Sequence, residues 1–179
     1  MKKKQRRAGQ KQRPPKPPIR PLRIGQTLGR DVGPIQHRLI GQFIVTWSRI
    51  ENALDDLIWT LLAMRECDGR ILTKRFDART KIVVLRELFV EKLSDDMKDE
   101  LFGTLASLDQ IREERNVVAH GLWHTIDGVP ATMSLRQKAE EAFIVSETFP
   151  AKKLRSLIAE ASELLMICVQ LRDKLAHPN

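Results

Sequence analysis

The chain has 179 residues, a length that fits one hydrophobic core. A composition of 42% hydrophobic and 30% charged residues, with a mean hydropathy of −0.31, is typical of globular proteins and argues against a fibrous chain. No apolar run is long enough to span a membrane, and no apolar segment follows the basic N-terminus as in a secretory signal. We therefore expect a cytoplasmic protein without a membrane partner. Cys67 and Cys168 are isolated in the sequence and predict neither a disulfide framework nor a cysteine zinc site.

The net charge of +8 is concentrated at the N-terminus. Residues 1–30 contain eleven Lys and Arg residues and no acid, and six of the nine prolines lie in the first 34 positions. Such a segment buries too little apolar surface to offset its ordering entropy, so we expect residues 1–33 to form a disordered basic arm. The arm is either a solvated leader or a collector of RNA phosphates. In the second case the contacts come from Lys2, Lys3, Lys4, Arg6, Arg7, Lys11 and Arg13.

Apolar residues recur at steps of three and four along most of the chain after Gly33-Pro34. This period is typical of amphipathic helices with one buried stripe. Cys67-Asp68-Gly69 is expected to end the first of them. The pattern predicts helices over about 34–65, 78–93, 95–120 and 150–177.

The helical period is lost between residues 122 and 147. The turn-forming pair Asp127-Gly128 predicts a β-hairpin over about 122–136. Residues 137–142 fit either a helical turn or an extension toward a third strand at 143–149. The prediction for residues 34–177 is therefore an all-α domain, an up-and-down bundle of four to five helices with a small β-hairpin insertion.

A polar run interrupts the apolar pattern at the end of the 95–120 helix, and it contains Arg115, Asn116 and His120. Asn116 and His120 are four residues apart and share a helix face, whereas Arg115 lies about 140° from His120 on an ideal helix. Arg115 must therefore use its long side chain to reach the same ligand. A guanidinium can hold a phosphate, and an imidazole can transfer a proton near neutral pH. These two groups are the minimum for cleaving RNA without a metal.

The segment Arg115-Asn116-Val117-Val118-Ala119-His120, followed by Gly121, resembles the motif of the HEPN (higher eukaryotes and prokaryotes nucleotide-binding) family. That motif is an Arg, usually followed by a polar residue, with a His after four to six intervening positions. The resemblance implies a helical fold, a homodimer that joins two motifs in one cleft, and metal-independent RNA cleavage in a defence or toxin context. An antitoxin or a larger complex would then surround the enzyme. The family also includes inactive members, which implies an alternative: a silent dimerising, nucleic-acid-binding or nucleotide-binding module.

A second match to the motif, Arg172-Asp173 with His177, lies close to the end of the chain. We favour the first match because the second is at a helix end that is expected to fray. His120 and His124 have an HxxxH spacing, but Gly121 is expected to end the helix between them. No Gly-rich phosphate loop occurs, and we expect neither a metal nor a cofactor.

Glu51 borders the apolar stripe of the first predicted helix. An acid that points inward needs a partner, and the candidates are Arg115 and Arg112. Glu51 could then orient the catalytic residues, or it could form an ordinary buried ion pair. Asn52 and Asp55 are expected to face solvent.

Overall fold

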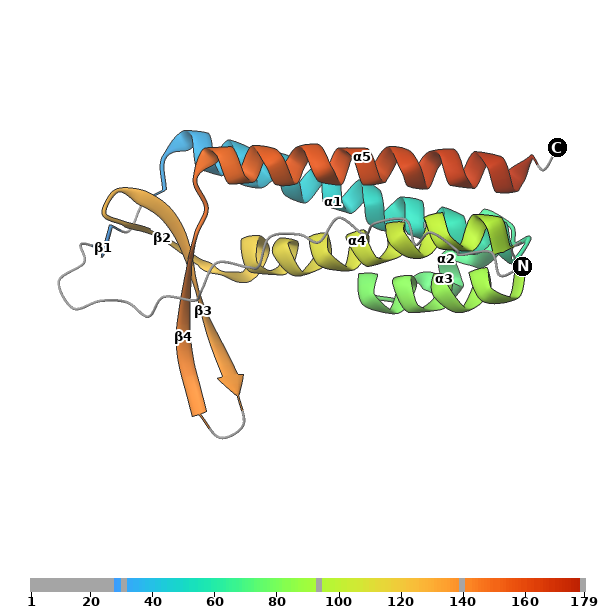
Figure 1. The fold of residues 1–179 in the computed structure, drawn as a ribbon, viewed down its shortest axis with the longest axis horizontal. Helices are drawn as coiled ribbons and strands as arrows, with labels where there is room; N and C mark the ends of the chain where they lie inside the picture. Colours follow the sequence, from blue (N-terminus) through green and yellow to red (C-terminus); the bar gives the residue numbers. More distant parts are fainter. Residues whose placement is uncertain (1–27, 30–31, 93–94, 139–140, 178–179) are drawn as a thin grey trace, which may run out of the picture.

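The computed structural model describes residues 28–29, 32–92, 95–138 and 141–177, and shows a mostly helical protein with a small antiparallel sheet (Figure 1). The seven basic residues predicted to bind RNA lie outside these ranges. The helices are α1 (Pro34–Leu61), α2 (Glu66–Thr73), α3 (Ala78–Lys92), α4 (Asp95–His120) and α5 (Ala151–Ala176). The strands are β1 (Leu28–Gly29), β2 (Leu122–Ile126), β3 (Val129–Lys138) and β4 (Glu141–Thr148).

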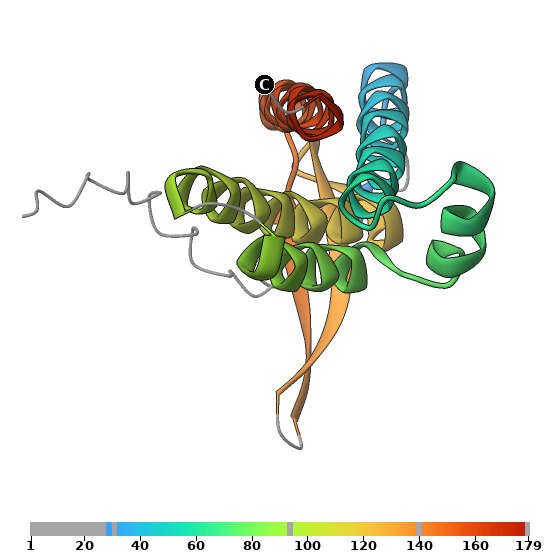
Figure 2. The same cartoon turned by 90° about the vertical axis from the view of Figure 1, so that its right-hand side faces the viewer.

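The long helices α1, α4 and α5 enclose the core. α1 and α5 lie side by side and run in the same direction, while α4 runs in the opposite direction (Figure 1). In the end-on view α3 packs under α4, and α2 lies to one side of the other helices (Figure 2). The largest fully buried side chains include Trp47, Phe43, Phe89 and Phe149. No helix in the described ranges has both the length and the apolar content required to cross a membrane.

α1 shows directly how the sequence produces a helix. Leu39, Phe43, Trp47, Ile50 and Leu54 are separated by three or four residues and are all buried, so they form one stripe facing the core. Pro34 occupies the first turn, where its missing N–H has no helical partner to lose. The stripe was therefore sufficient to predict the helix.

The prediction that residues 67–69 end the first helix was wrong, because they lie inside α2. α1 ends earlier, at Leu61, and Ala63 then takes a positive φ of 51°. Gly69 is needed for packing: a Cβ atom there would lie 2.5 Å from the Trp59 ring. A glycine that permits close packing was thus mistaken for a glycine that ends a helix.

The sheet has the order β1-β2-β3-β4, with every pair antiparallel. The predicted hairpin is present, because Ile126 pairs with Val129 across Asp127 and Gly128. These two residues have φ values of 50° and 77°, the left-handed region that a two-residue type I′ turn requires. Residues 137–138 and 141–142 were expected to form either a helical turn or a strand, and they belong to strands. β3 and β4 pair as a long hairpin that projects away from the helices (Figure 1).

Two structured pieces lie within the segment that was expected to be an arm. Leu28 and Gly29 pair with Ile126 and Thr125 as strand β1. Val32 is only 4% exposed. The packed domain therefore includes residues before Pro34.

A buried ion pair links α1 to α3. Lys81 Nζ lies 2.7 Å from Asp55 Oδ2, and the two side chains are 9% and 16% exposed. Lys81 Nζ also donates a hydrogen bond to the Glu51 carbonyl at 3.3 Å. Asn52 is exposed as expected, but the expectation that Asp55 faces solvent was wrong, because α3 covers it with a matching cation.

We predict that Lys81→Ala lowers the free energy of unfolding by about 3 kcal/mol, because it leaves the buried Asp55 carboxylate unpaired. Lys152→Ala, at an exposed position on α5, is the matched control and should change stability by less than about 0.5 kcal/mol. Urea unfolding followed by circular dichroism measures both values. Equal free energies of unfolding for the two variants would show that the ion pair between Lys81 and Asp55 does not stabilise the fold.

Candidate functional site

The last two turns of α4 bring together the three residues of the predicted motif. Arg115 Nη1 donates a hydrogen bond to Asn116 Oδ1 at 3.2 Å. The same nitrogen lies 3.4 Å from His120 Nε2. The long arginine side chain thus spans the angle that separates Arg115 from His120 on the helix.

The guanidinium of Arg115 has no carboxylate partner among the residues that the structure describes. Its Nε atom is buried and lacks a hydrogen-bond acceptor within the same part of the chain. His120 is exposed, while Arg115 and Asn116 are half-buried. The cationic group is therefore anchored on one side, and no carboxylate within residues 28–29, 32–92, 95–138 and 141–177 compensates its charge. An anionic ligand could supply the partner that the described protein groups do not.

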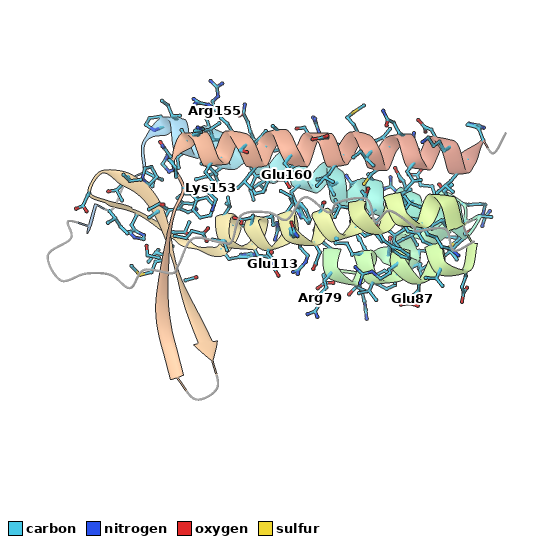
Figure 3. All side chains as sticks on the ribbon, in the orientation of Figure 1. Arg79, Glu87, Glu113, Lys153, Arg155 and Glu160 are labelled. Carbon is cyan, nitrogen blue, oxygen red and sulfur yellow. The ribbon has the colours of Figure 1, made fainter. Side chains whose placement is uncertain are left out.

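The carboxylate adjacent to Arg115 in the sequence is paired elsewhere. Glu114 Oε2 lies 3.3 Å from Lys153 Nζ, which also contacts Glu147 Oε1 at 2.5 Å. Lys153, labelled at the start of α5 in Figure 3, lies 3.8 Å above the centre of the Phe149 ring. The single ammonium of Lys153 therefore faces two carboxylates and hydrogen-bonds to Glu147, while Glu114 Oε2 is buried without a hydrogen bond among the described residues. The ion pair between Glu114 and Lys153 ties α4 to α5.

Close packing fixes the end of α4 beside the sheet. Gly121 N donates to the Val117 carbonyl at 2.9 Å. A Cβ atom on Gly121 would lie 2.5 Å from that carbonyl oxygen and 2.8 Å from Thr132 Cβ on β3. Trp123 Nε1 donates to the Val118 carbonyl at 2.9 Å, which satisfies one of the carbonyls left free at a helix end. His120 is therefore positioned by the contact between α4 and β3.

The two predicted supporting residues do not join this site. Arg112 Nε binds Asp109 Oδ1 at 2.8 Å, one turn earlier on α4. Within the described part of the chain, Glu51 forms no ion pair with Arg112 or Arg115. Asp109 is the local partner of Arg112, and the backbone at Glu51 faces Lys81 on α3. The predicted pairing of Glu51 with either arginine is therefore wrong.

The second motif match differs from the first in its charge balance. Arg172 lies 2.5 Å from Asp173 Oδ1 and 3.8 Å from Asp56 Oδ2. Burial raises the pKa of Asp56, and Arg172 opposes this shift. His177 is exposed at the end of α5, and no contact joins it to Arg172 in the described residues. A guanidinium paired with two carboxylates is a poor phosphate ligand.

His124 is engaged in the sheet. Its Nδ1 lies 3.2 Å from the Leu122 carbonyl, and its Nε2 lies 3.3 Å from Ser146 Oγ. His120 ends α4 whereas His124 belongs to β2, so the helix does end between them. The described residues contain no cluster of three His, Cys, Asp or Glu side chains that could hold a metal. Cys168 is buried, which raises the pKa of its thiol to about 12.

The sequence interpretation missed an apolar slot beside the motif. A cavity of about 340 Å³ lies between the start of α1 and the end of α4. A spacing of four residues at Ile40 and Ile44, next to the core stripe, was the available signal. Its walls, which define the apolar slot, are Val32, His37, Ile40, Ile44, Val118, Ala119 and Trp123.

Comparisons with known proteins return no relative from which a function could be transferred. No model of a protein family matches the chain, and no curated protein or solved structure matches it. The candidate site therefore rests on the geometry of Arg115, Asn116 and His120 and on the chemistry of their side chains.

We predict that Gly121→Ala destabilises the protein by about 2 kcal/mol, because the new methyl group would overlap Thr132 and the Val117 carbonyl. Gly103→Ala is the matched control on the same helix, where a Cβ atom meets nothing within 4 Å. That control should raise stability by about 1 kcal/mol, through better helix propensity. Chemical unfolding of both variants gives the sign of each change. A stable Gly121→Ala variant would refute the close approach.

Proposed function

We propose that this protein is a metal-independent endoribonuclease of the HEPN type. The observation that carries the proposal is the contact of 3.4 Å between the uncompensated guanidinium of Arg115 and the exposed imidazole of His120. A fixed cation next to an imidazole, a side chain that can both accept and donate a proton, suits phosphodiester cleavage. The resemblance of residues 115–121 to the HEPN motif supports the same assignment.

The reaction needs only groups that the chain and the RNA supply. The 2′-oxygen of the substrate forms a bond to the adjacent phosphorus, and the bond from phosphorus to the 5′-oxygen breaks. The products are a 2′,3′-cyclic phosphate and a 5′-hydroxyl. His120 would take the 2′-hydroxyl proton or give a proton to the leaving 5′-oxygen. Arg115 would neutralise the charge on the pentavalent phosphate, and Asn116 would hold the arginine in place.

A homodimer would complete this chemistry. One motif has a single imidazole, whereas the reaction needs both a base and an acid. Two copies of the chain, packed with their α4 ends together, would supply both groups in one cleft. We propose that each protomer is a HEPN-type helical bundle acting in the cytoplasm in a defence or toxin system, with an antitoxin or a larger complex controlling it.

We predict that the purified protein cleaves mixed RNA in EDTA and leaves 2′,3′-cyclic phosphate ends. Arg115→Ala and His120→Ala should each lower the rate at least about 100-fold, the usual contribution of a charge stabiliser or an acid–base group. The matched control is His177→Ala, because His177 belongs to the second motif match and is also exposed. This variant should cleave at the wild-type rate. Gel analysis of end-labelled RNA measures the rates.

Two results would contradict the proposal. Cleavage by His120→Ala at the wild-type rate would remove the motif from the mechanism. Absence of cleavage by wild-type protein that is folded and dimeric in sedimentation would favour the silent binding module instead.

We predict that removing residues 1–27 weakens RNA binding and flattens its salt dependence, because the deleted segment carries ten basic residues. The truncation keeps β1, so the packed domain stays intact. Each lost phosphate contact should reduce the slope of log K against log salt by about 0.7 for single strands. Fluorescence anisotropy over a salt series gives the slope. An unchanged slope would identify the arm as a leader without an RNA role.

A further inference from the structure

The apolar slot has the size and lining of a small-molecule site. Its volume of about 340 Å³ lies near the lower end of the range for small-molecule pockets, roughly 300–1,000 Å³. Five of its seven lining residues are aliphatic, and the other two are the indole of Trp123 and the imidazole of His37. The slot therefore has no formally charged carboxylate, lysine or arginine in its wall.

The apolar slot adjoins the cationic pair of the candidate site. Ala119 forms part of the slot wall and directly precedes His120. The guanidinium of Arg115 lies against His120, so the cationic pair borders the slot at residues 119 and 120. A ligand that extended from the slot to Arg115 and His120 would place its apolar part in the slot and its anionic part beside the two cationic side chains.

The wall of the slot is held in place before any ligand binds. Trp123 is fixed through its bond to the Val118 carbonyl and through packing on Phe149, with the ring centres 5.6 Å apart. Ile40 and Ile44, one turn apart on α1, are half-buried against the core. A preformed wall lowers the entropic cost of binding a rigid ring.

We propose that the apolar slot receives the base of the RNA nucleotide whose phosphate lies against Arg115 and His120. This inference rests on the proposed function and adds the determinant of base preference. A nucleotide combines a flat, largely apolar ring with an anion, and the slot and the cationic pair offer complementary surfaces for both. Bases of single-stranded RNA commonly stack on tryptophan and histidine side chains. His37 is the group in the wall that can form a hydrogen bond with a base edge.

The test compares three probes that separate the base from the phosphate. The probes are the four 3′-nucleotides, the matching nucleosides and inorganic phosphate, with binding measured by the NMR signal of the Trp123 indole N–H and by calorimetry. Ala119→Leu fills the slot. Ala106→Leu makes the same change at an exposed position of α4 outside the slot and is the matched control.

Wild-type protein should bind at least one 3′-nucleotide about tenfold more tightly than inorganic phosphate, through stacking of the base. Ala119→Leu should lose this preference and keep its affinity for phosphate, whereas Ala106→Leu should match the wild type. His37→Ala, a change at an exposed side chain, should reduce the difference among the four bases without affecting phosphate. The His37 variant keeps the inference testable if Ala119→Leu does not fold.

Three results would overturn the inference. The first is that the wild type binds no nucleotide more tightly than inorganic phosphate. The second is that Ala119→Leu keeps the preference for nucleotide over phosphate and His37→Ala keeps the difference among the bases, and the third is that Ala119→Leu no longer self-associates. The last result would mean that a second copy of the chain covers the slot.

The same experiments distinguish failure of the proposed function from failure of this inference. Slot-dependent nucleotide binding without RNA cleavage would refute the nuclease and support the slot. If wild type and Ala119→Leu cleave RNA with the same base preference, the nuclease is supported and the role of the slot is refuted.

Discussion

The close approach of the end of α4 to β3 is the constraint on which the candidate site depends. Gly121 leaves no room for a side chain between the Val117 carbonyl and Thr132. The chain turns there from helix to strand within one residue, so His120 lies at the boundary between the helices and the sheet. Trp123 then folds back to the Val118 carbonyl. The motif is therefore held by contacts from both parts of the fold.

The pairing of charges around α4 explains why one cation is available for a ligand. Two charged groups near the motif form ion pairs: Arg112 with Asp109, and Glu114 with Lys153. Arg115 has none among the described carboxylates. The contrast with Arg172, which contacts two carboxylates, separates two segments that look alike in the sequence. Charge balance in the tertiary structure therefore differs between two arginines that the motif alone does not distinguish.

The residues of the candidate site, the apolar slot and strand β1 lie at one end of the protein. The cationic pair and the apolar slot share the end of α4, and β1 pairs with β2, the strand that follows His120 (Figure 1). Under the proposed function, the basic arm, the slot and the cationic pair have complementary tasks: the arm gathers phosphates, the slot holds a base, and the cationic pair acts on the phosphate between them.

The sequence by itself determined the long helices, the hairpin turn and the motif, because each depends on residues close together in the chain. A buried stripe at steps of three and four requires a helix, Asp127-Gly128 tolerates positive φ, and Arg115 and His120 are one long side chain apart. The partner of Arg112 is local, since Asp109 lies three residues earlier on the same helix. Contacts between distant segments decided the rest. α2 packs against α1 where Gly69 approaches the Trp59 ring, and Lys81 of α3 covers Asp55. The apolar slot likewise follows from packing, which local periodicity does not encode.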